Sequence, residues 1–407
     1  MNLTWAILGI AFLILLHEAG HFYVARAVGM SPRRFYLGFP PAIVRVRRKG
    51  IEYGIGAIPL GGYVKIPGMH RPASSDLDVQ LAPVLREQPR LVGPVGRVKR
   101  PLDAYDLDGA LAALPELEQA VEEAQLSASA RRLAFRALTE LRDSLAPDAY
   151  WRQRTWKRIS VIFAGPGANL LIALLLPMIA FMIGAPGKTV RVVKRVDSNH
   201  PAARIGLRPG DEIVGVNGTT TADYTALSRA IKGSGGRPIT VTVLRDGMPH
   251  ILGPARAVKE DGRYILGFEP AWHTDQLGPL AALRKSAGDN WRAGKATITF
   301  LPRLFTDNGR KNVSGVVGIT DVSRQAIGLN FALFLQILGL ISLSLALLNL
   351  LPLLPLDGGH ILFSIIEGLR GRAVGREIYE RVSALGIALF LVLMFIGLSN
   401  DLSRIGG

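Results

Sequence analysis

Four apolar segments, each close to the length needed to cross a lipid bilayer, constrain the fold of this 407-residue chain most strongly. A helix needs about 20 predominantly apolar residues to span the hydrocarbon core. Hydrophobic residues make up 49% of the whole chain, a share compatible with several spans joined to soluble parts. We therefore predict a multi-pass α-helical membrane protein with four transmembrane helices, at approximately 3–25, 159–183, 330–351 and 382–398.

Basic residues cluster beside these segments and give the chain a formal net charge of +16. Cations next to membrane spans favour anionic lipid, so we expect membrane lipid and no nucleic acid as the partner of this charge. The positive-inside rule places the loops around 26–34, 152–158 and 370–381 in the cytoplasm, and both termini and residues 185–329 outside it. The first segment lacks a basic leader and a small-residue cleavage site, which favours a retained span over a signal peptide.

The first apolar segment carries a short polar motif near its end, His17-Glu18-Ala19-Gly20-His21. Residues four apart lie on one face of a helix, so His17 and His21 can offer two imidazole nitrogens to one Zn²⁺, with Glu18 beside the metal as a general base. A charged group at membrane depth costs roughly 2.5–3.5 kcal/mol, which indicates a functional role. The motif is short, and a histidine on an apolar helix is also compatible with a hydrogen-bonded core residue.

A catalytic zinc site commonly uses three protein ligands and a water, so a third ligand must come from elsewhere in the chain. The chain contains no cysteine, which excludes a thiolate ligand. Asp357 and His360 are candidates, both in the segment NLLPLLPLDGGH at the end of the third apolar segment. Its prolines break the helix and its glycines permit close backbone approach. An anionic oxygen offsets metal charge, which favours Asp357.

A β-meander is predicted directly after the first span. Residues 35–67 alternate β-branched and aromatic side chains around a turn at Lys49-Gly50, with strands expected at 42–47, 51–58 and 61–67. Beside a membrane, the edge of such a sheet can accept an extended substrate as an added strand. An ordinary surface hairpin fits the same periodicity.

Helices are expected in two further stretches. Residues 69–149 predict a cytoplasmic helical hairpin, at 104–124 and 128–145, that is either a partner-binding part or a solvated insert. Residues 280–305 predict amphipathic helices on the outer membrane surface, with apolar anchors at Trp291, Phe300, Leu301 and Phe305.

A compact soluble domain is predicted for residues 189–270, with strands at 190–196 and 239–244 and a helix near 224–232. Its run PAARIGLRPGDEIVGVNG, at 201–218, resembles a PDZ domain of the bacterial protease type. Asn217-Gly218 suits a hairpin turn. A PDZ groove binds an extended peptide by strand addition, and the alternative is a fold-holding module whose groove is blocked.

Four motifs follow one another in order: HEAGH at 17–21, FAGPGAN at 163–169, the PDZ-like run, and the segment ending in LDGG at 356–359. In this order the chain resembles the site-2 protease family of intramembrane zinc metalloproteases, in its PDZ-containing bacterial branch of the regulator of sigma-E protease type. The resemblance covers nearly the whole chain apart from residues 69–149. It implies a zinc metalloendopeptidase of the bacterial inner (cytoplasmic) membrane that cleaves single-span membrane proteins within or near the bilayer, with an anti-sigma factor or signal-peptide remnants as substrates.

The resemblance also implies a role for each site residue and a division of the chain. His17, His21 and Asp357 would bind Zn²⁺, and Glu18 would be the catalytic glutamate. Asn169, Asn349 and Pro352 would bind the substrate. The implied parts are 1–68 (first transmembrane helix and membrane-associated β-loop), 69–150 (cytoplasmic helical insert), 151–185 (second transmembrane helix), 186–271 (extracytoplasmic α+β PDZ domain), 272–328 (extracytoplasmic membrane-surface helices) and 329–407 (third and fourth transmembrane helices).

Two other functions are weighed against this one. A catalytically silent PDZ-containing scaffold that binds peptides has no need of a complete His, Glu and Asp set, so the intact motifs favour a protease. A zinc transporter would distribute polar residues along several spans, whereas here they gather at one depth.

Overall fold

The computed structural model describes residues 2–260, 263–300, 302, 306, 315–372 and 374–405. Leu301 and Phe305, two of the expected apolar anchors, lie outside the described residues. The chain forms two compact units. The first unit contains 1–176, 286–328 and 337–407, and the second contains 177–285 and 329–336.

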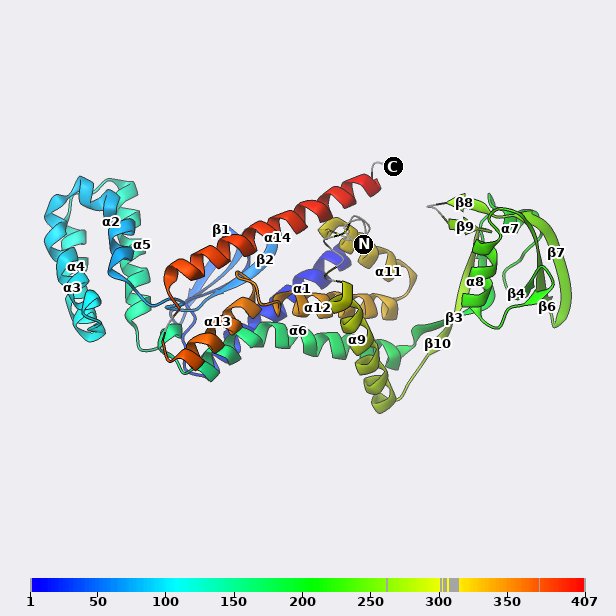
Figure 1. Ribbon diagram of the computed structural model, residues 1–407, viewed down its shortest axis with the longest axis horizontal. Coiled ribbons are helices and arrows are strands. Elements are labelled where there is room, and N and C mark those ends of the chain that lie inside the picture. Colours follow the sequence, from blue (N-terminus) through cyan, green and yellow to red (C-terminus); the bar gives the residue numbers. More distant parts are fainter. Residues whose placement is uncertain are drawn as a thin grey trace. The chain divides into compact units, whose positions relative to one another are not determined.

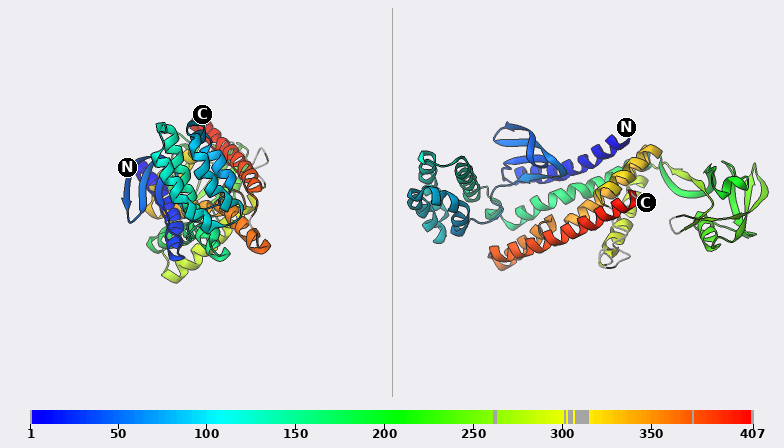
Figure 2. Two further views of the ribbon diagram at one scale, coloured as in Figure 1. Left: turned by 90° about the vertical axis from the view of Figure 1, so that its left-hand side faces the viewer. Right: turned by 90° about the horizontal axis from the view of Figure 1, so that it is seen from above.

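Four helices of the described chain are long and apolar enough to cross a membrane, as predicted. The helices lie alongside one another in two views (Figures 1 and 2). Many of their apolar side chains are exposed to the surroundings, as expected for helices whose solvent is lipid. The chain is therefore an integral membrane protein, with spans in α1 (Asn2–Ala27), α6 (Thr155–Ile183), α12 (Phe331–Asn349) and α14 (Arg376–Ile405).

The predicted β-meander is a sheet of two long, folded strands, β1 (Arg34–Arg48) and β2 (Ile51–Lys65). Phe35 of β1 pairs on one side with Tyr53 and on the other with Val64, so the start of β1 lies between the two halves of β2. The separate strands expected at 51–58 and 61–67 are thus one continuous strand. The turn at Lys49-Gly50 is confirmed, since both residues have positive φ, of 50° and 79°. The last part of β2 forms one edge of this sheet.

The insert after β2 contains more helix than the sequence predicted. Its helices pack around an apolar core of their own. The expected hairpin corresponds to the last two helices, and the first two, which contain Pro83 and Pro101, were not predicted. The helices are α2 (Ser74–Glu87), α3 (Val92–Asp103), α4 (Leu107–Glu123) and α5 (Ala128–Leu145).

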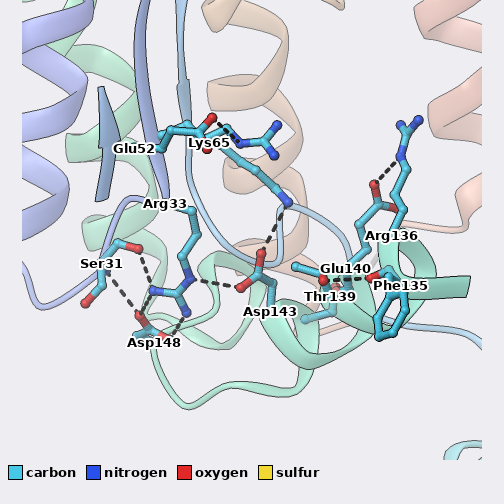
Figure 3. Close-up of polar contacts among 12 residues, drawn as sticks. Ser31, Arg33, Glu52, Lys65, Phe135, Arg136, Thr139, Glu140, Asp143 and Asp148 are labelled. Atoms are coloured by element: carbon cyan, nitrogen blue, oxygen red, sulfur yellow. Dashed lines mark hydrogen bonds and ion pairs between the residues drawn. The ribbon is translucent and has the colours of Figure 1, made fainter. Parts of the chain in front are cut away.

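Ion pairs attach α5 to the base of the β-sheet (Figure 3). Arg33, just before β1, places Nε 2.8 Å from Asp143 Oδ1, and Lys65, the last residue of β2, places Nζ 3.3 Å from Asp143 Oδ2. Arg33 Nη1 also lies 3.3 Å from Asp148 Oδ2. One carboxylate of the insert therefore joins both ends of the folded β-ribbon.

The second unit contains an antiparallel sheet and a packed helix, α8 (Tyr224–Gly233). The predicted strands and helix of this region are all present. The core is apolar and includes Ile213, Leu227 and Val241, each fully buried. The strands of the sheet lie in the order β10 (Phe268–Asp275), β3 (Ala185–Val196), β4 (Glu212–Val216), β6 (Pro238–Arg245) and β7 (Met248–Arg256).

The remaining helices of the first unit lie around the spans. α9 (Pro279–Phe300) is held against α6 by polar contacts, because Asn290 Nδ2 donates to Ala173 O at 2.8 Å. α11 (Val316–Leu329) begins near the end of α14, where Asp401 accepts hydrogen bonds from the amides of Gly315 and Gly318 at 3.1 and 3.0 Å. α13 (Asp357–Arg370) follows α12 after a short irregular segment and leads to α14.

Candidate metal centre

The two histidines of the HEAGH motif project from one face of α1 into the protein. His21 is 7% exposed and Glu18 is 9% exposed, although most of the same helix faces outward. The Nε2 atoms of His17 and His21 lie 3.3 Å apart. Two ring nitrogens at this distance leave a position between them that one cation can occupy.

Asp357 completes the group from the other end of the chain. α12 ends at Asn349, and the chain then turns back so that α13 begins at Asp357. Close backbone approach makes this turn possible, because a Cβ atom at Gly358 would collide with the carbonyl oxygens of Leu350 and Leu351. Asp357 Oδ2 lies 3.3 Å from His17 Nε2 and 3.6 Å from His21 Nε2.

The dimensions of this group fit zinc. Zn²⁺ bonds imidazole nitrogen and carboxylate oxygen at about 2.0–2.2 Å, so two ligand atoms of a tetrahedral site lie about 3.3–3.6 Å apart. The three edges measured between His17, His21 and Asp357 are 3.3, 3.3 and 3.6 Å. Among the residues that the structure describes, these are the only three that form such a group. Three ligands leave the fourth tetrahedral position for water or substrate.

Hydrogen bonds outside the ligand group orient both imidazoles. His21 Nδ1 lies 2.8 Å from the carbonyl oxygen of Val161 in α6, so Nδ1 donates and Nε2 keeps its lone pair for a metal. The side-chain amide of Asn169 lies 3.3 Å from His17 Nδ1. Asn169 is 1% exposed, and its backbone carbonyl oxygen accepts a hydrogen bond from the Ser342 hydroxyl of α12 at 2.8 Å. α6 therefore carries the support for both rings.

Two glycines that were not selected from the sequence also shape the site. A Cβ atom on Gly165 of α6 would lie 2.8 Å from His17 Nε2 and still closer to His21 Nε2, so only glycine leaves room for both ligand atoms. A Cβ atom on Gly62 of β2 would lie 2.7 Å from Glu18 Cγ, so the edge of the sheet passes directly over Glu18. Gly165 lies inside the FAGPGAN motif, and this motif was the feature of the sequence that could have indicated its role. No signal in the sequence marked Gly62.

The other predicted site residues have different positions. Asn349 and Pro352 lie at the end of α12 and in the segment leading to Asp357, and no side-chain hydrogen bond among the described residues joins either one to the metal group. His360, the rival third ligand, is outside the group. Its Nδ1 lies 2.6 Å from the hydroxyl of Tyr379 instead. Of the two candidates for third ligand, the structure therefore brings Asp357 to the histidines.

Comparison with known proteins identifies the family of the chain. The sequence profile of peptidase family M50 matches residues 5–393. The chain is 30% identical to the regulator of sigma-W protease RasP of Bacillus subtilis, over 97% of this chain and 96% of that protein. It is 29% identical to the regulator of sigma-E protease RseP of Salmonella typhimurium, over 99% of each chain, and 27% identical to the zinc metalloprotease RasP of Bacillus licheniformis, over 97% and 96%. A partly buried His, His and Asp group among apolar helices, together with this family match, is typical of a membrane-embedded metallopeptidase. The chain belongs to peptidase family M50, the site-2 protease family.

Proposed function

We propose that this protein is a zinc-dependent endopeptidase that cleaves single-span membrane proteins within or near the bilayer. The observation that carries the proposal is the group of His17, His21 and Asp357, whose ligand atoms lie within 3.6 Å of one another beside Glu18. Membership of family M50 makes the chain a zinc metallopeptidase that acts in intramembrane proteolysis. The assignment of individual residues to steps is our own.

His17, His21 and Asp357 would hold the zinc ion. When bound, zinc supplies a Lewis acid that lowers the pKa of a water molecule toward about 7 and polarises the scissile carbonyl. Glu18 accepts the proton of the attacking water and delivers it to the leaving amine. The Asn169 amide keeps the His17 ring in place. Because Glu18 is buried beneath β2, bulk water does not reach its carboxyl group while that group carries the proton.

The edge of the β-sheet offers the substrate a partner for its backbone. A helical substrate hides its carbonyls in internal hydrogen bonds and must unwind before water can attack one of them. Residues 62–65 of β2 form an edge of the sheet and begin directly over Glu18. An unwound segment that pairs with this edge replaces its lost hydrogen bonds. We expect residues of low helix propensity in the substrate span to favour cleavage, and Asn349 and Pro352 to contact its backbone.

Candidate substrates follow from the named relatives. RasP and RseP are regulators of the sigma-W and sigma-E pathways, and we infer an anti-sigma factor or signal-peptide remnants as substrates of this chain. The clusters of basic residues beside the spans support a location in the bacterial cytoplasmic membrane with both termini outside the cytoplasm.

The sheet and helix of the second unit support a PDZ domain at 186–271. Gly206 and Gly210 have φ values of 77° and 93°, and Asn217-Gly218 forms a tight turn with φ values of 50° and 76°, as the PDZ-like run requires. Such a domain either binds the substrate's outer segment or excludes substrates with bulky outer domains. The parts 1–68, 69–150, 151–185, 272–328 and 329–407 remain our division of the rest of the chain.

Glu18→Gln tests the proposal. The amide keeps the shape of the side chain but cannot accept the water proton, so cleavage should fall by at least about 100-fold. The zinc content should stay at the wild-type level because Glu18 is not a ligand. Cleavage is followed by mass spectrometry of tagged single-span proteins incubated with the purified enzyme in lipid nanodiscs.

Glu116→Gln provides a matched control. Glu116 lies in α4 of the insert, 57% exposed, and pairs with Arg97, so the same chemical change there should leave cleavage unaltered. Turnover by Glu18→Gln at the wild-type rate would remove Glu18 from the mechanism.

A further inference from the structure

A large cavity of about 1300 Å³ lies beside the metal centre in the first unit. Its walls come from the end of β2, from α2 and α5 of the insert, and from α13 and the beginning of α14. None of the three metal-group residues lines it. Sites for small molecules occupy about 300–1,000 Å³, so this volume suits a longer ligand.

Two elements lead from the metal centre into the cavity. α13 begins at Asp357, and His360, one turn later, lines the cavity wall. On the opposite side Gly62 lies against Glu18, and the next residues of β2, from Tyr63 onward, line the cavity. A polypeptide paired with this edge would therefore continue from the reacting bond into the cavity.

The walls of the cavity are held by buried contacts. Asp143 binds Lys65 and Arg33 at the base of the sheet (Figure 3). Tyr150 OH lies 3.1 Å from Ser364 Oγ of α13. Arg158 of α6 places Nη2 2.6 Å from Glu367 Oε2, with both side chains less than a fifth exposed. The cavity is thus formed before any ligand enters.

One cation at the rim is oriented but lacks an anionic partner. The Arg71 guanidinium lies 4.7 Å from the ring centre of Tyr105 and 5.4 Å from that of Trp151. No carboxylate in the described chain pairs with Arg71 or with Arg372, a second exposed arginine of the cavity lining. The other two lining cations, Lys65 and Arg158, are both paired. A guanidinium held flat by aromatic rings keeps its hydrogen-bond donors available, and their planar fork matches a carboxylate.

We propose that this cavity binds an acidic, extended segment of the uncleaved substrate, on the insert side of the scissile bond, with Arg71 pairing with one of its Asp or Glu side chains. The inference rests on the proposed endopeptidase function and assigns the insert a part in substrate selection. The insert supplies one wall through α2 and α5, and the sheet edge aligns the segment. An extended chain advances about 3.3 Å per residue, so a few residues beyond the scissile bond suffice to enter the cavity.

Charge-swapped substrates test the role of Arg71. Two single-span substrates share one transmembrane segment and differ only in the segment that follows it on the insert side. In the acidic substrate this segment carries Asp and Glu, and in the neutral substrate the same positions carry Asn and Gln. The wild type should cleave the acidic substrate about two- to five-fold more efficiently, the range expected for a partly exposed ion pair. Arg71→Ala should bring this ratio to about one, and Arg71→Glu should favour a lysine-bearing substrate.

Arg90→Ala is the matched control, because Arg90 is an exposed arginine of the insert that does not line the cavity. This variant should keep the wild-type ratio. Equal cleavage of both substrates by the wild type, or an unchanged ratio in Arg71→Ala, would overturn the cavity assignment alone. Failure of the wild type to cleave either substrate would instead contradict the proposed function.

Cross-linking locates the segment independently of cleavage. The chain contains no cysteine, so one introduced thiol reports one position. In the Glu18→Gln background, Gln80→Cys, which lines the cavity, should form a disulfide with a cysteine in the acidic segment of the substrate. Its neighbour Val79 is 76% exposed and points elsewhere, so Val79→Cys should not. Equal cross-linking at both positions would overturn the proposal.

Discussion

In the proposed reactive group, three candidate ligand atoms lie beside the Glu18 carboxylate, and all four side chains belong to or adjoin the membrane-spanning helices. Unpaired ionisable groups in such a position are costly, and they persist where a partner or a cation compensates them. His21 is held by Val161 O at 2.8 Å and His17 by the Asn169 amide at 3.3 Å, so the rings are oriented before metal arrives. This outer support is as much a part of the site as the ligands themselves.

Gly165→Ala tests the geometry at the level of one methyl group. The added Cβ would occupy the space in front of the His17 and His21 Nε2 atoms, so zinc affinity should fall by at least about tenfold while the helix remains folded. Zinc affinity is measured by chelator competition and folding by circular dichroism. Gly167→Ala in the same helix is the control, since its Cβ would touch only the ring of Phe163. Wild-type zinc affinity in Gly165→Ala would contradict the described site.

Residue spacing and chemistry predicted part of this group. The i, i+4 spacing predicted that His17 and His21 lie close together, because residues four apart lie on one face of a helix. Asp357 is 340 positions from His17 in the sequence, so only its chemical character and the resemblance indicated it. Gly165 and Gly62 matter because they lack a side chain and so leave room for neighbouring side chains of the site. Composition and periodicity do not predict such a close approach.

At the scale of elements, the length of the apolar segments predicted the spans. The helices of the first, second and fourth spans extend beyond the predicted bounds into charged flanks, whereas α12 is slightly shorter than predicted. α2 and α3 were not predicted; each contains a proline, which packing against the insert core accommodates. In the folded sheet the start of β1 pairs with both halves of β2, and the alternation of side chains does not specify this register.

His200 makes one element of the second unit sensitive to pH. Its Nε2 lies 2.8 Å from Glu260 Oε1 of β8 (Val258–Glu260), and its Nδ1 lies 3.0 Å from Asp197 Oδ2. The hydrogen bond to Glu260 raises the pKa of His200 above its usual value, with Asp197 adding to the effect. The stabilisation is therefore complete below about pH 6.5 and is lost as pH rises through the elevated pKa.

Hydrogen exchange of β8, corrected for the intrinsic rate at each pH, should show protection that declines as the pH rises above about 6.5 and through the raised pKa of His200. His200→Asn should lose protection at the acidic end and show no such decline. His250→Asn, which changes an exposed histidine of β7, should behave like the wild type. Equal protection across the range in the wild type would contradict the role of His200.

At the scale of the whole molecule, the fold brings together groups that are far apart in the chain. In the proposed site, α1 carries the two histidine ligands and the base, α6 supports the rings, and the turn before α13 brings in the third ligand, Asp357. The sheet covers Glu18, and the insert, attached through Asp143, completes a cavity beside the site. The insert was the part of the chain whose contribution sequence reasoning described least, since its contacts with the sheet are long-range ion pairs.

Zinc retention after equilibration with a chelator, compared between Asp357→Ala and His360→Ala, tests the central claim most directly. The two residues are one helical turn apart, and only Asp357 belongs to the metal group. We expect the wild type and His360→Ala to retain about one zinc per chain and Asp357→Ala to lose most of it. Zinc retained by Asp357→Ala at the wild-type level would contradict the account.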